Sequence, residues 1–216
     1  MNENGRTQSD TKQRILDAAE YLFAHDGYRG TSLRAITGKA RVNLAAVNYH
    51  FGSKETLLEE VIRRRLLPLN RIRKERIEEV RENARKKGKK PDVKAVLLAF
   101  IEPTLLFKES SSEAENFVTF IGRSITDPDD TVRQVFHRFI KPLFHLLFET
   151  SCEALPEHPK DLVFWRLHFT IGSLFHTLHI CGKFKPDDIV HVKTEMDAKT
   201  LVDLIIPYVT AGMRAK

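Results

Sequence analysis

Residues 43–54 carry side chains that can form specific hydrogen bonds, and their spacing places these side chains on one short helix. Asn43 is a good N-cap, and the apolar residues after it recur at positions suited to one inward face. The opposite face carries small, amide, phenol and imidazole groups instead of the long charged side chains usual on a surface helix. Such groups suit close approach to base edges in a DNA groove. The residues on or near this outward face are Leu44, Ala45, Asn48, Tyr49 and His50.

A second short helix, preceding the first, is predicted to position it. Thr31 and Ser32 can cap its start, and Leu33, Ile36 and Ala40 follow at helical spacing. Residues 31–54 therefore form two short helices around a tight turn, which is the arrangement of a DNA-binding helix-turn-helix.

Lys54 stands at the predicted start of the next helix, after Gly52 and Ser53. Gly52 can adopt the left-handed conformation that ends a helix, and Ser53 can cap the helix that follows. A cation at a helix N-terminus is unfavourable by ~0.3–1 kcal/mol. Its position makes sense if a phosphate lies nearby and outweighs that cost.

This stretch resembles the TetR family of transcriptional repressors, in the pattern Thr31-Ser32-Leu33-Arg34-x-Ile36, then Val42 and Val47-Asn48-Tyr49-His50-Phe51-Gly52-Ser53-Lys54. The motif match is strong over about residues 11–62; beyond them only length and helical character support it. The resemblance implies a second helix that enters the major groove. It also implies DNA contacts, many of them at phosphates, from Thr31, Ser32, Arg34, Tyr49, His50 and Lys54.

Two positions depart from the family pattern. Arg41 stands in the turn where Gly is frequent, and it would carry strain of ~1 kcal/mol if its φ is positive. Asn48 stands where many members have a tyrosine, and it can read adenine through a bidentate amide contact or be a plain solvated amide. For Tyr49 the alternative to a DNA contact is a packing role.

Composition and charge favour a globular protein with a polyanionic partner. The chain has 216 residues, of which 42% are hydrophobic, enough for one large or two small domains. Residues 1–90 hold 21 Lys/Arg against 12 Asp/Glu, whereas residues 91–216 hold 14 against 17. Double-stranded DNA is the expected partner of the basic part.

No apolar run approaches the ~20 residues that span a bilayer. No signal peptide opens the chain, and Cys152 and Cys181 form no disulfide or metal spacing, so we expect a cytoplasmic protein.

The chain is predicted to be all-helical, with a DNA-binding domain over residues 1–62 and a helical ligand-binding and dimerisation domain over residues 63–216. A first helix from about residue 10 to residue 27 completes a three-helix unit, and a helix from Lys54 closes its core. Pro68 is expected to kink or break that helix, and Pro103 to end the next one. Further helices are expected near residues 113–124, after residue 128 with a kink at Pro142, at residues 159–180 and at residues 197–213 with a bend at Pro207.

Twelve of the 14 Phe residues lie between Phe100 and Phe184, which favours a cavity for an apolar, elongated effector. The alternative is that these rings simply fill the core. The resemblance implies an effector in the C-terminal bundle that moves the two DNA-binding heads apart. Some regulators with a stretch similar to residues 42–54 respond to fatty acids or their thioesters. The candidate ligand-binding residues are Phe100, Phe117, Phe120, Arg123, Phe144, Arg166 and His168.

Residues 167–177 are apolar nearly all round, so this helix needs cover on two sides. A second copy of the chain would supply this cover. This helix and the last helix of both copies would then form a four-helix dimer interface, as the resemblance also implies. Two recognition helices about 34–36 Å apart would meet successive major grooves of a roughly palindromic operator. The candidate interface residues of this homodimer are Phe169, Gly172, Ser173, His176, Leu201 and Ile205.

Two other functions remain alternatives at this stage. His176 and His179 with Cys181, and with His145 and His168, can be read as a metal site or as hydrogen-bonded packing residues. For catalysis there is no Gly-rich phosphate loop, no Gly-x-Ser-x-Gly and no His-Glu-x-x-His, so no catalytic residue and no cofactor are predicted. A helical enzyme built from dispersed residues would leave the outward face of residues 44–50 unexplained.

Overall fold

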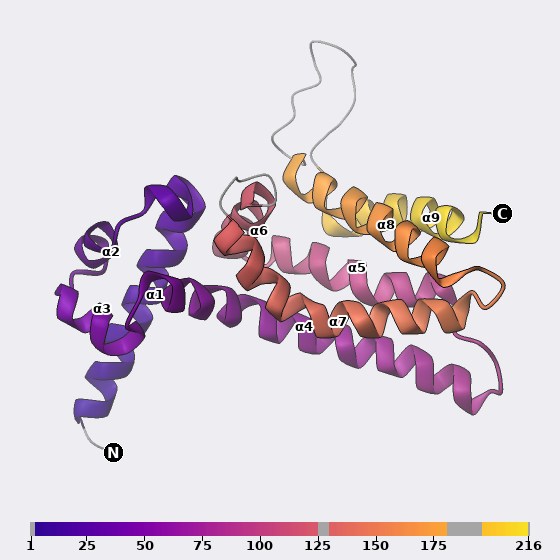
Figure 1. The fold of residues 1–216 in the computed structure, drawn as a ribbon, viewed down its shortest axis with the longest axis horizontal. Coiled ribbons are helices and arrows are strands. Elements are labelled where there is room, and N and C mark those ends of the chain that lie inside the picture. Colours follow the sequence, from indigo (N-terminus) through magenta and orange to yellow (C-terminus); the bar gives the residue numbers. More distant parts are fainter. Residues whose placement is uncertain (1–2, 125–129, 181–195, 216) are drawn as a thin grey trace, which may run out of the picture. The chain divides into compact units, whose positions relative to one another are not determined.

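The computed structural model describes residues 3–124, 130–180 and 196–215, and the regular structure in these residues is entirely helical (Figure 1). The all-helical prediction is confirmed. No helix among the described residues is long and apolar enough to cross a membrane. The helices are α1 Glu3–Gly30, α2 Leu33–Ala40, α3 Leu44–Phe51, α4 Lys54–Lys86, α5 Val93–Glu109, α6 Ser112–Ser124, α7 Asp130–Ala154, α8 Lys160–Ile180 and α9 Ala198–Arg214.

Internal contacts divide the chain into two compact units. Unit 1 comprises Met1–Leu67 and Asn116–Phe139, and unit 2 comprises Pro68–Glu115 and Ile140–Lys216. The single boundary after Ile62 expected from the sequence differs from this division, because parts of α6 and α7 contact the N-terminal helices. A boundary drawn along the sequence cannot represent a unit built from two separate segments.

Unit 1 is organised by α1, which packs against both α2 and α3. Burial of each large apolar side chain contributes roughly 1.5–3 kcal/mol. Leu22, Leu33 and Val42 are only half-buried. The phenyl ring of Phe23 stacks on that of Phe120 with 5.9 Å between centroids, which extends the core into α6. The core residues of α1 to α4 include Ile15, Ala19, Phe23, Ile36, Val47, Phe51, Leu57, Leu58, Val61 and Ile62.

Helix α1 begins earlier than about residue 10, the start predicted from the sequence, and is interrupted near its end. Gly27 has φ 74° and ψ 168°, a conformation open to glycine because it lacks a Cβ. The expected stop at residues 26–27 therefore coincides with this interruption, after which one more turn leads to α2.

Two predicted helix breaks are absent. Helix α4 runs through Pro68 and α5 runs through Pro103. Pro68 is exposed, so water can hydrate the carbonyl of Arg64 that loses its helical donor. Pro103 is buried, and the packing of α5 maintains the helix around it. The break predicted at Pro103 was wrong because packing outweighed a local cost of about 3 kcal/mol, and of the kink or break predicted at Pro68 the break does not occur.

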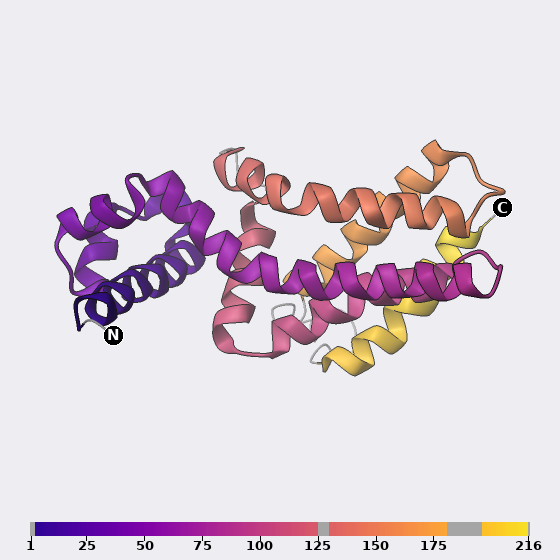
Figure 2. The same cartoon turned by 90° about the horizontal axis from the view of Figure 1, so that it is seen from below.

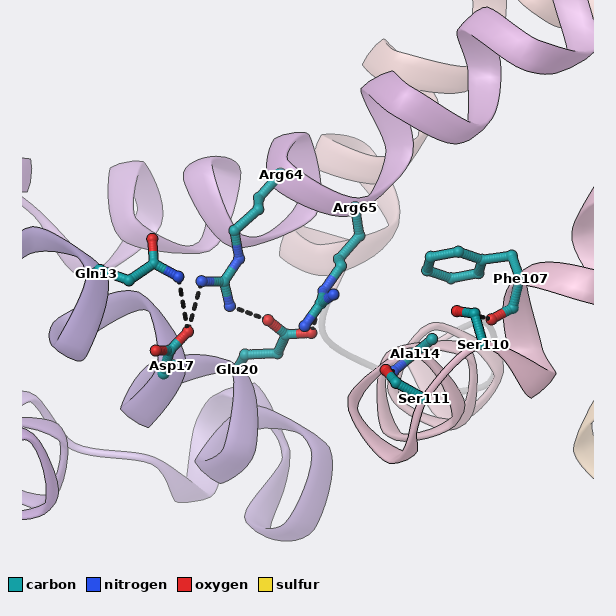
Figure 3. A network of polar contacts seen from close by, with 9 residues as sticks. All are labelled: Gln13, Asp17, Glu20, Arg64, Arg65, Phe107, Ser110, Ser111 and Ala114. Carbon is teal, nitrogen blue, oxygen red and sulfur yellow. Dashed lines mark hydrogen bonds and ion pairs between the residues drawn. The ribbon is translucent and has the colours of Figure 1, made fainter.

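A network of polar contacts joins α1 to the first half of α4 within unit 1 (Figure 3). Glu20 is 5% exposed, and its carboxylate pairs with the guanidinium groups of both Arg64 and Arg65. Arg64 also pairs with Asp17 at 2.6 Å, and Gln13 donates to the same carboxylate oxygen at 3.1 Å. Helix α1, which supports α2 and α3, is thereby fixed to α4.

Unit 2 is built around α5, which packs along α9, while α8 contacts both (Figure 2). Asp92 and Asp197 cap α5 and α9 by accepting backbone N–H hydrogen bonds. Gly88, with φ 60°, follows the end of α4, where glycine commonly ends a helix. Arg81 of α4 pairs with Glu153 of α7.

Candidate nucleic-acid interface

Thr31 and Ser32 precede α2 but have different environments. The Ser32 hydroxyl accepts a hydrogen bond from the backbone N–H of Ala35 at 3.1 Å, so Ser32 is the predicted N-cap. Thr31 is 1% exposed, and its hydroxyl donates to the carbonyl oxygen of Gly27 at 2.8 Å. The prediction that the Thr31 side chain contacts DNA is corrected, because this buried side chain instead ties α2 to the end of α1.

The turn between α2 and α3 is centred on Arg41, which has φ 54° and ψ 48°. The backbone N–H groups of Arg41 and Val42 donate to the carbonyl oxygens of Gly38 and Thr37 at 3.2 and 3.1 Å, which closes the C-terminus of α2. The left-handed conformation considered for Arg41 is thus confirmed, and such a conformation is expected to cost a residue with a Cβ ~1 kcal/mol.

Arg14 of α1 supports this turn from outside it. Its Nη2 atom donates to the carbonyl oxygens of Ala40 and Arg41 at 2.5 and 2.9 Å. A guanidinium at a helix C-terminus satisfies otherwise unpaired carbonyls and lies at the negative end of the helix dipole. The role of Arg14 could not be predicted from the sequence because its contact is long-range and has no local motif.

Helix α3 is held by a cap at its start and by an inner apolar face. The Oδ1 atom of Asn43 accepts a hydrogen bond from the Ala46 N–H at 2.9 Å, which confirms the predicted N-cap. Val47 and Phe51 are buried against the rest of unit 1. This packing turns the other side of the helix outward, as expected. The exposed residues there are Leu44, Ala45, Asn48 and Tyr49.

Tyr49 is 75% exposed, which excludes the alternative of a buried packing role. Its ring meets that of the half-buried His50 edge-on, at 5.1 Å between centroids. Asn48 is exposed, so its amide is available for a base contact and equally for solvent. The outer face of α3 therefore presents an amide and a phenol beside two small or medium apolar groups.

Lys54, at the start of α4, has partners that the sequence did not indicate. Its ammonium donates to the carbonyl oxygen of Tyr28 and lies 4.2 Å from the centroid of the Tyr28 ring. The contact gives Lys54 a structural role beside any contact with phosphate. Ser53 caps α4, since its hydroxyl accepts from the Thr56 N–H at 3.0 Å.

Further cations lie on the same unit. Arg34 of α2 is exposed, as a phosphate contact would require. The Lys39 ammonium lies 3.5 Å from the centroid of the Tyr21 ring, and Lys12 pairs with Glu60 at 3.9 Å. Of these cations, Arg34 and Lys39 belong to α2 itself, whereas the charge of Lys12 is offset by Glu60.

The candidate ligand-binding residues are divided between the two units. Phe117 and Phe120 are buried in unit 1, and the Phe23–Phe120 stack favours a core-filling role for Phe120. In unit 2, the rings of Phe144 and His168 lie 5.5 Å apart. Arg166 donates to the carbonyl oxygen of Met213 at 3.0 Å, which joins α8 to the end of α9. Phe100 is buried in α5, and the side chain of Arg123 lies outside the described residues.

The candidate dimer residues are exposed on α8 but buried on α9. Phe169 is 67% exposed, and Gly172 and His176 are exposed, whereas Ser173 is half-buried. Leu201 and Ile205 are buried, so their assignment to a surface seam is corrected: they face the bundle, against which α9 packs. The exposed apolar residues of the two helices form what we call the α8–α9 patch: Leu162, Trp165, Phe169, Leu204 and Tyr208.

The metal-site hypothesis rests partly on residues that are not described. Cys181 and the side chain of His179 lie outside the described residues. Within the part of the chain that is described, no group of three or more His, Cys, Asp or Glu residues is placed to hold a metal ion.

Two family models match the chain. The model for "Bacterial regulatory proteins, tetR family" matches residues 15–61, which contain α2 and α3. The model for "Tetracyclin repressor-like, C-terminal domain" matches residues 98–212.

Individual relatives show where the similarity lies. The Bacillus subtilis protein named as a probable HTH-type transcriptional regulator, YttP, is 40% identical over 52 residues, which are 24% of this chain and 25% of that protein. The chain thus spans about a quarter of the length of this curated relative. Two solved structures share the fold over nearly the whole chain. The fatty acid degradation regulator FadR from Bacillus halodurans has TM-score 0.66, 16% identity and coverage of 95% and 97%. FadR from Bacillus subtilis in complex with stearoyl-CoA has TM-score 0.64, 17% identity and coverage of 93% and 98%.

Proposed function

This chain belongs to the tetR family of bacterial transcriptional regulators, a non-enzymatic family, and we propose that it represses transcription by binding a roughly palindromic operator as a homodimer. An apolar effector releases it from that operator. Membership of this non-enzymatic family removes the alternative of a helical enzyme.

The observation that carries the proposal is the outward face of α3. Asn43 caps the helix, and buried Val47 and Phe51 fix its inner side. Asn48 and Tyr49 are consequently held exposed on a rigid support, which base recognition in a major groove requires. The net positive charge of residues 1–90 supplies attraction to phosphates.

Dimerisation is proposed through the α8–α9 patch. Several large apolar side chains exposed on adjacent helices are unusual on a monomer. Phe169→Glu and Tyr208→Glu would bury a charge in the seam, so we expect both variants to sediment as monomers. Ile72→Glu, at an exposed apolar residue of α4, is the matched control and should leave the sedimentation of the wild type unchanged. Wild-type protein that sediments as a monomer would contradict the dimer.

A fatty acyl group is the proposed chemical class of the effector. The similarity to FadR of Bacillus subtilis in complex with stearoyl-CoA motivates this choice, although at 17% identity it concerns the fold alone. The grouped rings of Phe144, Phe164 and His168 in unit 2 offer apolar and aromatic surface for such a ligand.

A gel-shift experiment tests the function directly. Binding-site selection from random duplexes should return a roughly palindromic sequence with half-sites about one helical turn apart. Affinity for it should fall steeply with salt, as expected for a protein that neutralises several phosphates. Adding long-chain acyl-coenzyme A or fatty acid should reduce the retarded fraction. Failure to select any sequence would contradict the repressor function, whereas selection without ligand release would remove only the effector class.

A further inference from the structure

Arg73 is a buried cation in the middle of α4, in unit 2. Its side chain is 5% exposed. Lys and Arg are almost never fully buried unless they are paired, because removing a charge from water is expensive. A buried arginine therefore calls for an anionic partner.

The partners of Arg73 among the described residues are neutral. Its Nη1 atom donates to the Asn70 side-chain oxygen at 3.0 Å, and its Nη2 atom donates to the Thr104 hydroxyl oxygen at 2.5 Å. The guanidinium carbon lies 4.8 Å from the centroid of the Phe100 ring. In contrast, Arg76, one turn further along α4, pairs with a carboxylate, that of Glu102.

The guanidinium of Arg73 retains unused donors. It has five N–H groups, of which Asn70 and Thr104 take one each. The Nε atom is buried and has no hydrogen-bond partner. The Thr104 hydroxyl serves Arg73 only as a neutral hydrogen-bond acceptor. Its own proton is donated to the carbonyl oxygen of Phe100 at 2.9 Å.

Burial lowers the pKa of Arg73 to about 9, because the low-dielectric surroundings disfavour the charged form. The group nevertheless remains protonated at neutral pH. A ligand that brings a negative charge to this position would compensate the lost hydration and use the unused donors.

We propose that Arg73 binds the anionic oxygen group of an otherwise apolar effector, with the Phe100 ring beside the apolar part of that ligand. The ligand class is a carboxylate or a phosphate attached to an alkyl or acyl chain. This inference rests on the effector-responsive function proposed above.

Calorimetric titration of the full-length protein tests the site with four ligands that share a dodecyl or dodecanoyl chain. The ligands are dodecanoate, dodecyl phosphate, dodecanoyl-coenzyme A and 1-dodecanol. We expect at least one anionic ligand to bind about tenfold or more tightly than the alcohol, since charge-assisted hydrogen bonds are stronger than neutral ones. The ligand with the highest affinity identifies whether the anion is a carboxylate, a phosphate or a coenzyme A thioester.

Arg73→Met should remove this preference and bring the anionic ligands and 1-dodecanol to similar affinities. Arg71→Met is the matched control, because Arg71 lies on the same helix with its side chain 77% exposed and should keep the preference of the wild type. If Arg73→Met does not fold, the affinities of the wild type for the four ligands still test whether the anionic group of the ligand strengthens binding. Equal wild-type affinity for the anions and the alcohol, or no binding of any of the four, overturns the proposal.

The failure of the inference and the failure of the proposed function give different results. An anion preference that depends on Arg73, without release of the operator in a gel shift, supports the site and contradicts the effector-controlled repressor. Release of the operator by dodecanoate or by dodecanoyl-coenzyme A that is unchanged in Arg73→Met supports the repressor and overturns the site.

Discussion

The guanidinium of Arg14 donates to the carbonyl oxygen of Arg41 at 2.9 Å, so one arginine stabilises the left-handed backbone of another. The turn that carries Arg41 sets the angle between α2 and α3, and α3 bears the exposed residues of the candidate interface. Support for the turn therefore matters to DNA recognition although neither arginine needs to contact a base.

Arg14→Met should lower the free energy of unfolding by about 1–2 kcal/mol, because two carbonyl oxygens lose a charge-assisted donor. Operator affinity should fall with it, since α3 loses its fixed orientation. Chemical denaturation and gel shifts on the same preparations measure both quantities. Asp26→Asn, at an exposed residue of the same helix outside the contact with the turn, serves as a control; equal effects of the two substitutions would contradict the role of Arg14.

Arg41→Gly should raise the free energy of unfolding by up to about 1 kcal/mol, because glycine adopts the left-handed conformation without a Cβ clash. Arg41→Val should lower it by more than 1 kcal/mol, roughly, because β-branched residues tolerate positive φ least. Urea denaturation of the three proteins gives the order. A glycine variant less stable than the valine variant would show that Arg41 is not strained.

Local features of the interface were predictable from the sequence, whereas the long-range polar contacts were not. Asn43, Ser32 and Gly52 act through backbone groups a few residues away, so their residue types and positions suffice to predict their roles. Thr31 resembled Ser32 as a capping residue, and only the packing of α1 against α2 shows that its side chain is buried.

The prolines and the buried charges show why sequence alone did not determine unit 2. Pro103 reads as a helix break because it removes one hydrogen bond, yet the packed surface of α5 maintains the helix. Arg73 lies in a run of charged residues typical of a solvated face, and its burial depends on α5, which lies beyond the connector after α4. Such outcomes depend on tertiary packing, which no local pattern encodes.

Lys54→Ala should weaken binding to all duplexes alike, because a phosphate contact carries no base information. The variant also loses the bond to the Tyr28 carbonyl, so reduced affinity alone does not identify a phosphate contact. The slope of log affinity against log salt separates the two effects: loss of one phosphate contact lowers its magnitude by about 1. Lys89→Ala in the connector after α4 is the control, and an unchanged slope for Lys54→Ala would assign Lys54 a purely structural role.

Asn48→Ala should relax the preference at one base pair by about 1–3 kcal/mol if the amide reads an adenine edge. The exposed position of Asn48 on α3 makes this contact possible without rearrangement of the core. Binding-site selection with the wild type and the variant gives the preference at every position. Arg34→Ala provides the comparison, since loss of a phosphate contact should lower affinity without changing the selected sequence. Identical selected sequences for wild type and Asn48→Ala would leave Asn48 as a solvated amide.

Arg73→Met should raise the free energy of unfolding of the ligand-free protein by about 1–4 kcal/mol at pH 7, because it removes a buried charge that lacks a carboxylate partner. Burial lowers the pKa of Arg73 to about 9, below its value in the unfolded chain, so the unfolded state binds more protons above that pH. The free-energy cost of burying the charged guanidinium is therefore present in full below about pH 9 and declines as the pH rises further. The difference in unfolding free energy between Arg73→Met and wild type should consequently be smaller at about pH 10 than at pH 7. Guanidinium denaturation of wild type, Arg73→Met and Arg71→Met at both pH values measures the difference. A variant less stable than wild type at pH 7 would mean that the bonds to Asn70 and Thr104 outweigh the desolvation of the guanidinium.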